Sequence, residues 1–225
     1  MTQLNNSKND TPAVNSLEPR WPAMIALLAV GGMYLALPAG LAVGPRWVLL
    51  AIVGALLIPA MLAHHGDHPV ANAVLGHLLS GVITIFMLWS VYLLILALPD
   101  RKQPPADLLR SAALLWITNI LVFASWYWRL DAGGPHQRAK RLGHPTGAFL
   151  FPQMSAGEKH TKEKDGRPWS PRFVDYLFLA FNSSTALSPT DVPVLSRWAK
   201  GMMMVQALIS ITVIAILVGR AINTL

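Results

Sequence analysis

Long uncharged runs of apolar residues alternate with short polar connections along most of the chain. Five runs approach or reach the length of a membrane-crossing helix: 21–43, 47–63, 70–98, 111–128 and 201–219. A helix rises about 1.5 Å per residue, so about 20 residues cross the roughly 30 Å of bilayer hydrocarbon. The pattern therefore predicts five membrane-spanning helices, the first two paired as a hairpin by the turn at 44–46.

A sixth segment, 173–191, is apolar but shorter. Its uncharged part, 176–190, carries several hydroxyl or amide side chains, among them Asn182, Ser183, Ser184, Thr185 and Ser188. It either crosses the membrane as a short helix sheltered by the bundle, or it enters the membrane as a helix and returns to the same side as irregular backbone. Irregular backbone within the membrane is stable only where it is buried in protein or lines a water-filled cavity. The predicted fold class is an all-α integral membrane protein, a bundle of about six helical segments of which the fifth is short and polar.

Four parts follow from this pattern. They are a polar N-terminal tail (1–20), four transmembrane helices (21–128), a basic loop containing Pro and Gly (129–172), and a short pore-like helix, a turn and a final transmembrane helix (173–225). Composition agrees, because 53% of the residues are hydrophobic, 13% are charged, and Arg46 and Asp67 are the only charges between 21 and 99. The absence of cysteine excludes disulfides, thiolate metal sites and a lipoprotein anchor.

Basic residues near the span ends indicate orientation, because cytoplasmic connections are enriched in Lys and Arg. With six crossings and a cytoplasmic N-terminus, 12 basic residues lie inside and 6 outside. The sequence thus predicts a membrane protein with both termini in the cytoplasm. A re-entrant fifth segment would instead leave five crossings and place the termini on opposite sides.

The loop 129–172 is the one long connection between the apolar runs, with nine basic and four acidic residues. Anionic lipid headgroups are the expected partner, at about 1 kcal/mol per basic residue near the membrane surface. Nucleic acid is not expected, because the loop has no recognisable reading motif.

His64, His65 and His68 lie close together beside Asp67 and suggest a metal site by composition. Gly66 and Pro69 interrupt any helix that would place them on one rigid face. We therefore interpret the cluster as a polar turn, and expect neither a bound metal nor a cofactor.

The segment 173–191 carries the most informative chemistry. On a helix of about 100° per residue, Asp175 and Asn182 share one face. An unpaired charge in lipid costs at least a few kcal/mol, so that face is expected to turn inward, toward partners such as Asn119 or His77. Asp175 either anchors the helix N-terminus through the helix dipole or lines a polar route. The candidate lining residues are Asp175, Asn182, Ser183, Ser184, Thr185 and Asp191.

Three blocks of the C-terminal half, WYWRLDAGGP (126–135), FLFPQM (149–154) and the stretch from FVDYL (173–177) to SPTD (188–191), resemble those of an uncharacterised family of bacterial multi-pass inner-membrane proteins. That resemblance implies no activity. More distantly, the order of short helix, Ser/Thr-rich turn, Asp and final span is similar to the pore helix, filter and inner helix of two-helix potassium channels. The stretch TALSPTD (185–191) has no glycine where a potassium filter has two, so potassium selectivity is not implied.

Two functions follow as hypotheses. The first is permeation or transport of an ion or small polar solute, and the second is a non-catalytic membrane scaffold or envelope factor whose basic loop binds lipid or a partner protein. Enzymatic activity is not expected, because the chain has no zinc-protease, nucleophile-elbow or phosphate-loop motif. A second copy of the chain is a further expected partner.

Overall fold

The structure is a computed structural model that describes residues 19–65, 68–98, 104–140, 147–155, 169–185 and 192–222. Helices contain 83% of these residues and no strand is present among them, which confirms the all-α class. The helices are α1 (Trp21–Leu35), α2 (Trp47–His65), α3 (Pro69–Leu96), α4 (Pro105–Leu130), α5 (Pro135–Lys140), α6 (Pro152–Ser155), α7 (Phe173–Thr185) and α8 (Arg197–Ile222).

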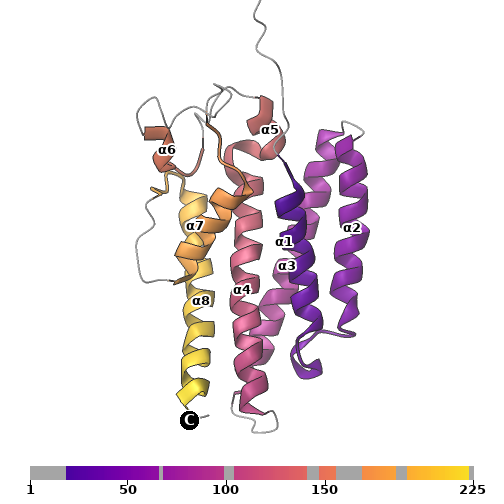
Figure 1. Ribbon diagram of the computed structural model, residues 1–225, viewed down its shortest axis with the longest axis vertical. Coiled ribbons are helices and arrows are strands. Elements are labelled where there is room, and N and C mark those ends of the chain that lie inside the picture. Colours follow the sequence, from indigo (N-terminus) through magenta and orange to yellow (C-terminus); the bar gives the residue numbers. More distant parts are fainter. Residues whose placement is uncertain are drawn as a thin grey trace, which may run out of the picture.

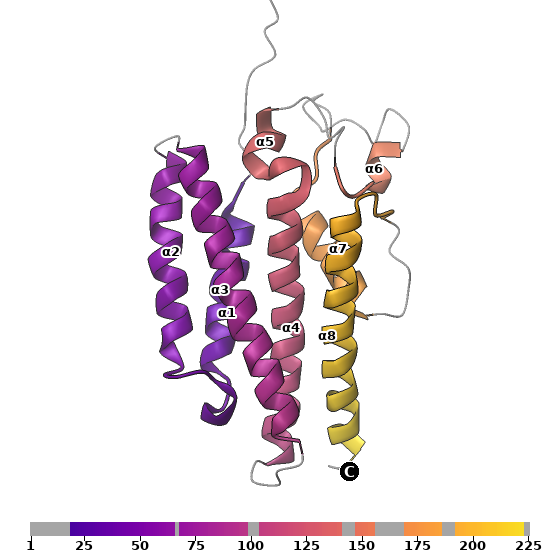
Figure 2. The same ribbon diagram turned by 180° about the vertical axis from the view of Figure 1, so that it is seen from behind.

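Helix α4 is the central element of the bundle (Figures 1 and 2). It contacts α1 and α3 on one side and α7 and α8 on the other. In the most apolar stretch of each helix, 61% of the residues of α4 are buried, against 39% in α3 and 22% in α8. The core of the protein therefore surrounds α4, while α8 presents most of its surface to the exterior.

The hairpin of α1 and α2 forms as expected, but α1 is shorter than the apolar run that contains it. It ends at Leu35 because Pro38 cannot donate a backbone hydrogen bond and disfavours helical backbone just before it. The return is closed by Tyr34, whose hydroxyl accepts from Val43 N at 2.5 Å. Where α1 and α2 pack, Gly31 lets the two helix backbones approach closely, because a Cβ at this position would lie 3.3 Å from Leu50 Cα.

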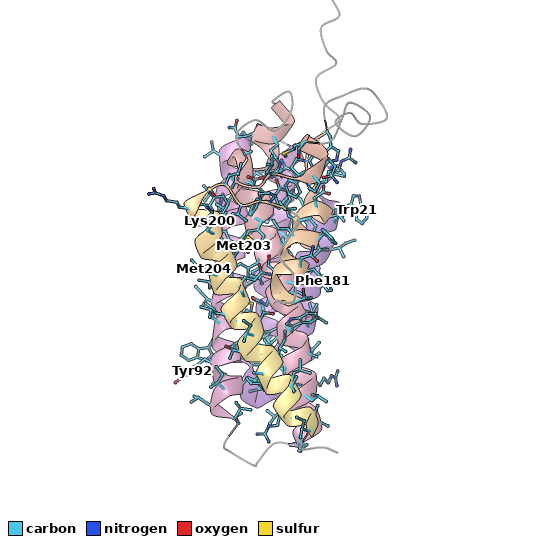
Figure 3. The ribbon with its side chains drawn as sticks, turned by 90° about the vertical axis from the view of Figure 1, so that its left-hand side faces the viewer. Trp21, Tyr92, Phe181, Lys200, Met203 and Met204 are labelled. Carbon is cyan, nitrogen blue, oxygen red and sulfur yellow. The ribbon has the colours of Figure 1, made fainter. Side chains whose placement is uncertain are left out.

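Helices α3, α4 and α8 are long and apolar enough to cross a membrane, and α1 and α2 are shorter apolar helices. Large apolar side chains point outward along the bundle, among them Trp21, Tyr92 and Met204, which are 62%, 51% and 63% exposed (Figure 3). Exposed apolar surface on this scale is typical of proteins that contact lipid or a partner.

Helix α7 extends only about halfway along the bundle (Figures 1 and 2). Its 13 residues measure about 20 Å, against about 39 Å for the 26 residues of α8. Its first residue, Phe173, packs on Trp128, and Val194, which follows the segment, pairs with Phe149 in a single bridge at that same end. Residues Phe173 and Val194, on either side of the segment, therefore lie at the same end of the bundle.

The first and last described helices begin and end at opposite ends of the bundle. The start of α1 lies at the end of the bundle that carries α5 and α6, which we call the loop end, at the top of Figure 1. The end of α8 lies at the opposite, far end, where Arg220 Nη2 donates to Leu98 O at 2.5 Å. Helices α1, α2, α3, α4 and α8 alternate in direction, so α1 begins and α8 ends at opposite ends of the bundle (Figures 1 and 2).

Parts of 129–172 are helical, which differs from the expected loop and brings the number of α-helices among the described residues to eight. After α4 the chain turns sharply through residues 131–134, where Ala132, Gly133 and Gly134 have φ values of 50°, 80° and 86°. Gly134 also has a steric requirement, because a Cβ there would lie 2.7 Å from Arg129 O. The turn directs α5 back over the loop end.

Candidate functional site

A buried polar cluster lies midway along the bundle, where α4, α7 and α8 meet. Its centre is Gln206, whose Nε2 donates to Ala180 O and Ser184 Oγ, each at 2.7 Å. The Gln206 Oε1 accepts from the Tyr127 hydroxyl at 2.5 Å, and Gln206 O accepts from Asn119 Nδ2 at 3.2 Å. Both sides of the amide are thus satisfied, and one side chain joins all three helices.

A second set of bonds holds the C-terminal turn of α7. Ser210 donates through its hydroxyl to Ser184 O at 2.5 Å, and Trp116 Nε1 donates to Ser210 Oγ at 2.9 Å. Ser210 is the fourteenth of the 26 residues of α8, and Asn119 is the fifteenth of the 26 in α4. The end of α7 is therefore fixed at mid-depth by side chains of its two neighbours.

The cluster leaves one polar atom unmatched. Asn119 Oδ1 is buried and has no hydrogen-bond partner in the structure. A buried amide oxygen without a partner costs about 1 to 3 kcal/mol, so this position favours a bound water or another donor.

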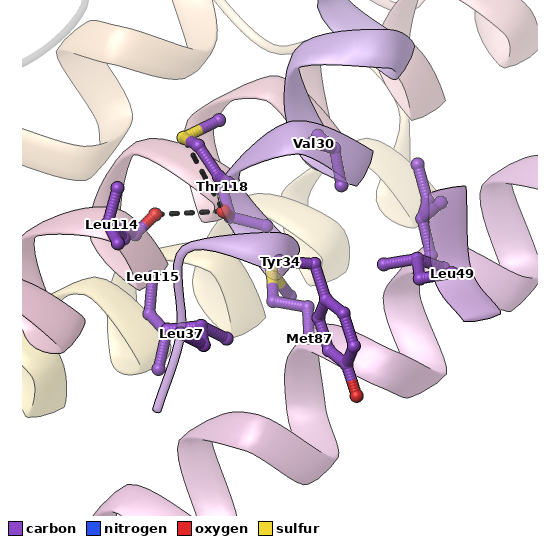
Figure 4. A pocket seen from close by; sticks show the side chains of 10 residues that line it. Val30, Tyr34, Leu37, Leu49, Met87, Leu114, Leu115 and Thr118 are labelled. Atoms are coloured by element: carbon purple, nitrogen blue, oxygen red, sulfur yellow. Dashed lines mark hydrogen bonds between the residues drawn. The ribbon is translucent and has the colours of Figure 1, made fainter. Parts of the chain in front are cut away.

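A separate cavity lies between α1, α2, α3 and α4 (Figure 4). Its volume is about 10 Å³, close to the least that can hold one water molecule. Apolar side chains form most of its lining, and Thr118, its hydroxyl bonded to Leu114 O at 2.8 Å, is one of the few polar groups. This cavity is too small and too apolar to serve as a route for an ion.

A charged cluster is buried at the loop end. Asp131 is fully buried, and its two carboxylate oxygens accept from Ala148 N at 2.5 Å and from the Tyr176 hydroxyl at 2.6 Å. Arg138 Nη1 donates to Trp128 O and Asp131 O, at 2.8 and 2.9 Å, and the guanidinium lies 5.1 Å from the centre of the Tyr176 ring. The loop-end cluster of Asp131, Arg138 and Tyr176 thus joins the connection 131–148 to the first turns of α7.

Aromatic rings surround this cluster. Phe149 contacts four of them, with ring centres between 5.3 and 6.4 Å apart: Tyr127, Phe151, Tyr176 and Trp198. Trp169 packs on Phe151 at 5.7 Å. Such edge-on pairs add about 0.5 to 1.5 kcal/mol each beyond burial, so the described parts of 129–172 form a packed cap on the bundle.

The structure places Asp175 in the first turn of α7, where its carboxylate accepts from Arg172 N at 2.7 Å. This is half of a capping box, in which the third helical residue bonds the N–H just before the helix. Burial raises the pKa of the Asp175 carboxyl, although its bond to the Arg172 backbone and the charge of Arg172 oppose that shift. The contact favours the interpretation of Asp175 as an anchor of the helix.

The remaining predicted residues separate into three groups. Ser184 belongs to the mid-depth cluster, whereas Ser183 and Thr185 donate their hydroxyls to carbonyls of their own helix, Leu179 O and Asn182 O. Asn182 is half-buried, and Asp191 lies outside the described residues. The inward face of α7 carries Tyr176, Ala180 and Ser184, so Asp175 and Asn182 lie at its edge, contrary to expectation.

Of the proposed inside partners, Asn119 is in the mid-depth cluster and His77 is not. His77 Nδ1 lies 2.6 Å from Ala73 O in its own helix, and its ring contacts Trp126.

The histidine cluster is described only in part. His64 and His65 are the last two residues of α2, His68 is exposed, and the side chains of the first two lie outside the described set, as does Asp67. Among the described side chains, no group of three or more His, Cys, Asp or Glu is arranged to hold a metal ion.

Sequence reasoning did not single out several members of these clusters, among them Tyr127, Asp131, Arg138, Tyr176, Gln206 and Ser210. A signal for two of them was present, because Gln206 and Ser210 are polar residues four positions apart in an otherwise apolar run. Polar side chains at that spacing within a span indicate a helix contact. Asp131 carried a weaker signal, since it follows a span in a region read as solvated.

Comparison with known proteins gives no match: no protein-family model, no curated protein and no solved structure is similar to this chain.

Proposed function

We propose that the chain is an integral membrane protein with five crossing helices and a re-entrant α7, and that an assembly of several copies conducts a small cation. The observation that carries this proposal is α7, a half-length helix that ends at mid-depth between α4 and α8. Half-helices of this kind occur in membranes where their ends contact an ion or polar solute.

The polarity of α7 favours a cation. Its N-terminus lies at the loop end, so its C-terminal turn, with the negative end of the helix dipole, lies at mid-depth. The same order of pore helix, turn and final helix underlies the similarity to two-helix potassium channels. Because TALSPTD (185–191) has no glycine, the proposed conduction does not discriminate strongly between potassium and sodium.

The route does not run through a single copy. The contact of α7 with α4 and α8 is closed by the bonds of Gln206 and Ser210. On the outer side of α7, Val174, Phe178 and Phe181 are exposed. A second copy on this apolar side would bring the adjoining edge, with Asp175 and Asn182, to the boundary between copies.

Counting basic residues on the five-crossing arrangement supports an orientation. The loop end then has 13 of the 18 Lys and Arg residues, a larger excess than six crossings give. They are Lys8, Arg20, the nine of 129–172, Arg197 and Lys200, against Arg46, Arg101, Lys102, Arg110 and Arg220 at the far end. The proposed orientation has a cytoplasmic loop end and N-terminus, in the bacterial inner membrane, and a C-terminus on the outer side.

Cysteine labelling tests this topology directly, because the natural chain has no cysteine. Single variants Ser7→Cys, Ala156→Cys and Thr224→Cys are treated in intact spheroplasts with a membrane-impermeant maleimide. We expect only Thr224→Cys to react before the membrane is opened, and all three to react afterwards. Reaction of Thr224→Cys on the same side as Ala156→Cys would contradict the re-entrant arrangement.

Ion flux in proteoliposomes tests the function. We expect uptake of both sodium and potassium, little chloride uptake, and several-fold slower cation flux in Asn182→Ala, whose amide lies on the proposed route. Thr212→Val is the matched control, because that exposed hydroxyl on α8 bonds its own helix at Leu208 O. If the wild-type protein is folded yet passes none of these ions, conduction is abandoned in favour of the scaffold function.

Anionic lipid remains the proposed partner of 129–172, but fewer of the basic residues in this segment are available to bind headgroups. Arg138 is only 3% exposed and donates to backbone carbonyls, so it does not reach headgroups.

A further inference from the structure

Arg129, the penultimate residue of α4, occupies a notch in α3. A Cβ on Gly76 would lie 1.8 Å from Arg129 Nη1 and 2.6 Å from Cζ, so the guanidinium fills the space that a side chain at Gly76 would take. The adjacent Trp128 ring lies 5.3 Å from Arg129 Cζ. The arginine is therefore held in one place by the shape of the neighbouring helix and by an aromatic ring.

This positive charge has no carboxylate partner within the described structure. The acids described there are Asp107, which lies at the far end, Asp131, which bonds Ala148 and Tyr176, and Asp175, which caps α7. Arg129 Nε is buried and makes no hydrogen bond, while the side chain as a whole stays half-buried. A fixed guanidinium whose charge no described carboxylate neutralises is suited to bind an anion with two or more oxygens.

A second arginine lies beside it. Arg20, just before α1, is close enough to Arg129 to interact electrostatically with it, although like charges repel. Arg20 directly precedes the first residue of α1, Trp21, and Arg129 follows Trp128 near the end of α4. Tryptophans at helix ends are typical of the headgroup region, where the abundant anion is a phospholipid phosphate.

We propose that Arg129 and Arg20, with the notch at Gly76, form a discrete site for the phosphate of an anionic phospholipid. The site rests on the membrane orientation of the proposed function and is independent of ion conduction. It differs from a diffuse attraction by the basic loop, because it needs one guanidinium in one position.

The test is lipid retention and thermal stability of the delipidated full-length protein in detergent. Wild-type protein receives short-chain phosphatidylglycerol, short-chain phosphatidylcholine or inorganic phosphate, and bound lipid is counted by native mass spectrometry. We expect one phosphatidylglycerol to be retained and to raise Tm, and phosphatidylcholine to do neither. Arg129→Gln should weaken this binding about fivefold, the effect of one basic residue near a headgroup.

Two further variants keep the test decisive. Arg20→Gln changes the second arginine without touching the packed notch, so it reports on the site even if Arg129→Gln folds poorly. Arg110→Gln, on the exposed far-end turn of the same helix α4, is the matched control and should bind like wild type.

Equal binding of both lipids, or unchanged phosphatidylglycerol binding in Arg129→Gln and Arg20→Gln, would overturn the proposal. A Tm increase with inorganic phosphate and none with phosphatidylglycerol would overturn the lipid as the source of the phosphate. Because no ion flux is measured, failure here leaves the conduction proposal untouched, and failure of conduction leaves this site standing.

Discussion

Asp131→Asn is expected to destabilise the protein by about 3 kcal/mol. The Asp131 carboxylate is fully buried and accepts from two donors, Ala148 N–H and the Tyr176 hydroxyl. Asparagine offers one acceptor oxygen and turns an NH₂ group toward the other donor. A buried group that loses its partner costs about 1 to 3 kcal/mol, and the bond that remains is weakened because the charge is gone. Denaturant titration of the purified protein in mild detergent measures the loss.

The matched control is Asp107→Asn, the same change at the other end of the same helix. Asp107 is exposed in the first turn of α4, where its interaction with the helix dipole contributes about 0.3 to 1 kcal/mol. Tyr176→Phe should lower the free energy of unfolding by less than Asp131→Asn does. The loss in the double variant should be smaller than the sum of the two single losses, since the two side chains share one hydrogen bond. Equal stability of Asp131→Asn and Asp107→Asn would show that the loop-end cluster does not hold the cap.

Most of the helical framework could be predicted from the sequence, because apolar length and charge-free runs are local properties. The structure has a helix in each of the six predicted segments, with ends shifted by local chemistry. Helix α4 begins at Pro105, earlier than the apolar run at 111, because proline suits the first helical position and Asp107 suits the first turn. Helix α1 ends early because of Pro38, whose effect the apolar count does not include.

The path of the fifth segment could not be predicted without knowing its tertiary contacts. Length and polarity left crossing and re-entry open, since both can be satisfied by a sheltering bundle. The position of α7 depends on Gln206 and Ser210, which bond its end at mid-depth, and the position of the chain after it depends on Phe149, which pairs with Val194 at the loop end. These partners are 22 or more residues away from the residues they bond, and no local pattern assigns them.

The candidate site was predicted less well than the framework. Ser184, predicted to line a polar route, lies in the mid-depth cluster, whereas Asp175 and Asn182 were predicted on the inward face and lie at its edge, and Asp131 was not singled out. The reason is physical: charge and proline content marked 129–172 as solvated, whereas a buried carboxylate with two donors is stable inside a packed aromatic cap. Sequence patterns report average polarity and not which donor a given carboxylate will meet.

Gln206→Leu is expected to release α7 from α8 and to lower the free energy of unfolding by about 2 to 3 kcal/mol. Leucine is similar in size but provides no bond for Ala180 O, the Ser184 hydroxyl or the Tyr127 hydroxyl, all held by Gln206. Hydrogen bonds between helices in membranes contribute about 0.6 to 2 kcal/mol each. Thr212→Val, an exposed change on the same helix, should leave stability within about 0.5 kcal/mol of wild type.

The local consequence distinguishes this effect from general destabilisation. With Asn182→Cys as a probe, a water-soluble maleimide should react faster in the Gln206→Leu background than in the Thr212→Val background, because α7 alone loses its anchor at mid-depth. The far end is held by other contacts, among them Arg220 to Leu98, so a cysteine placed at Ile222 should react equally in both. Equal acceleration at both positions would indicate that the bundle opens as one unit. Unchanged rates at both would mean that the Gln206 bonds do not hold α7 in place.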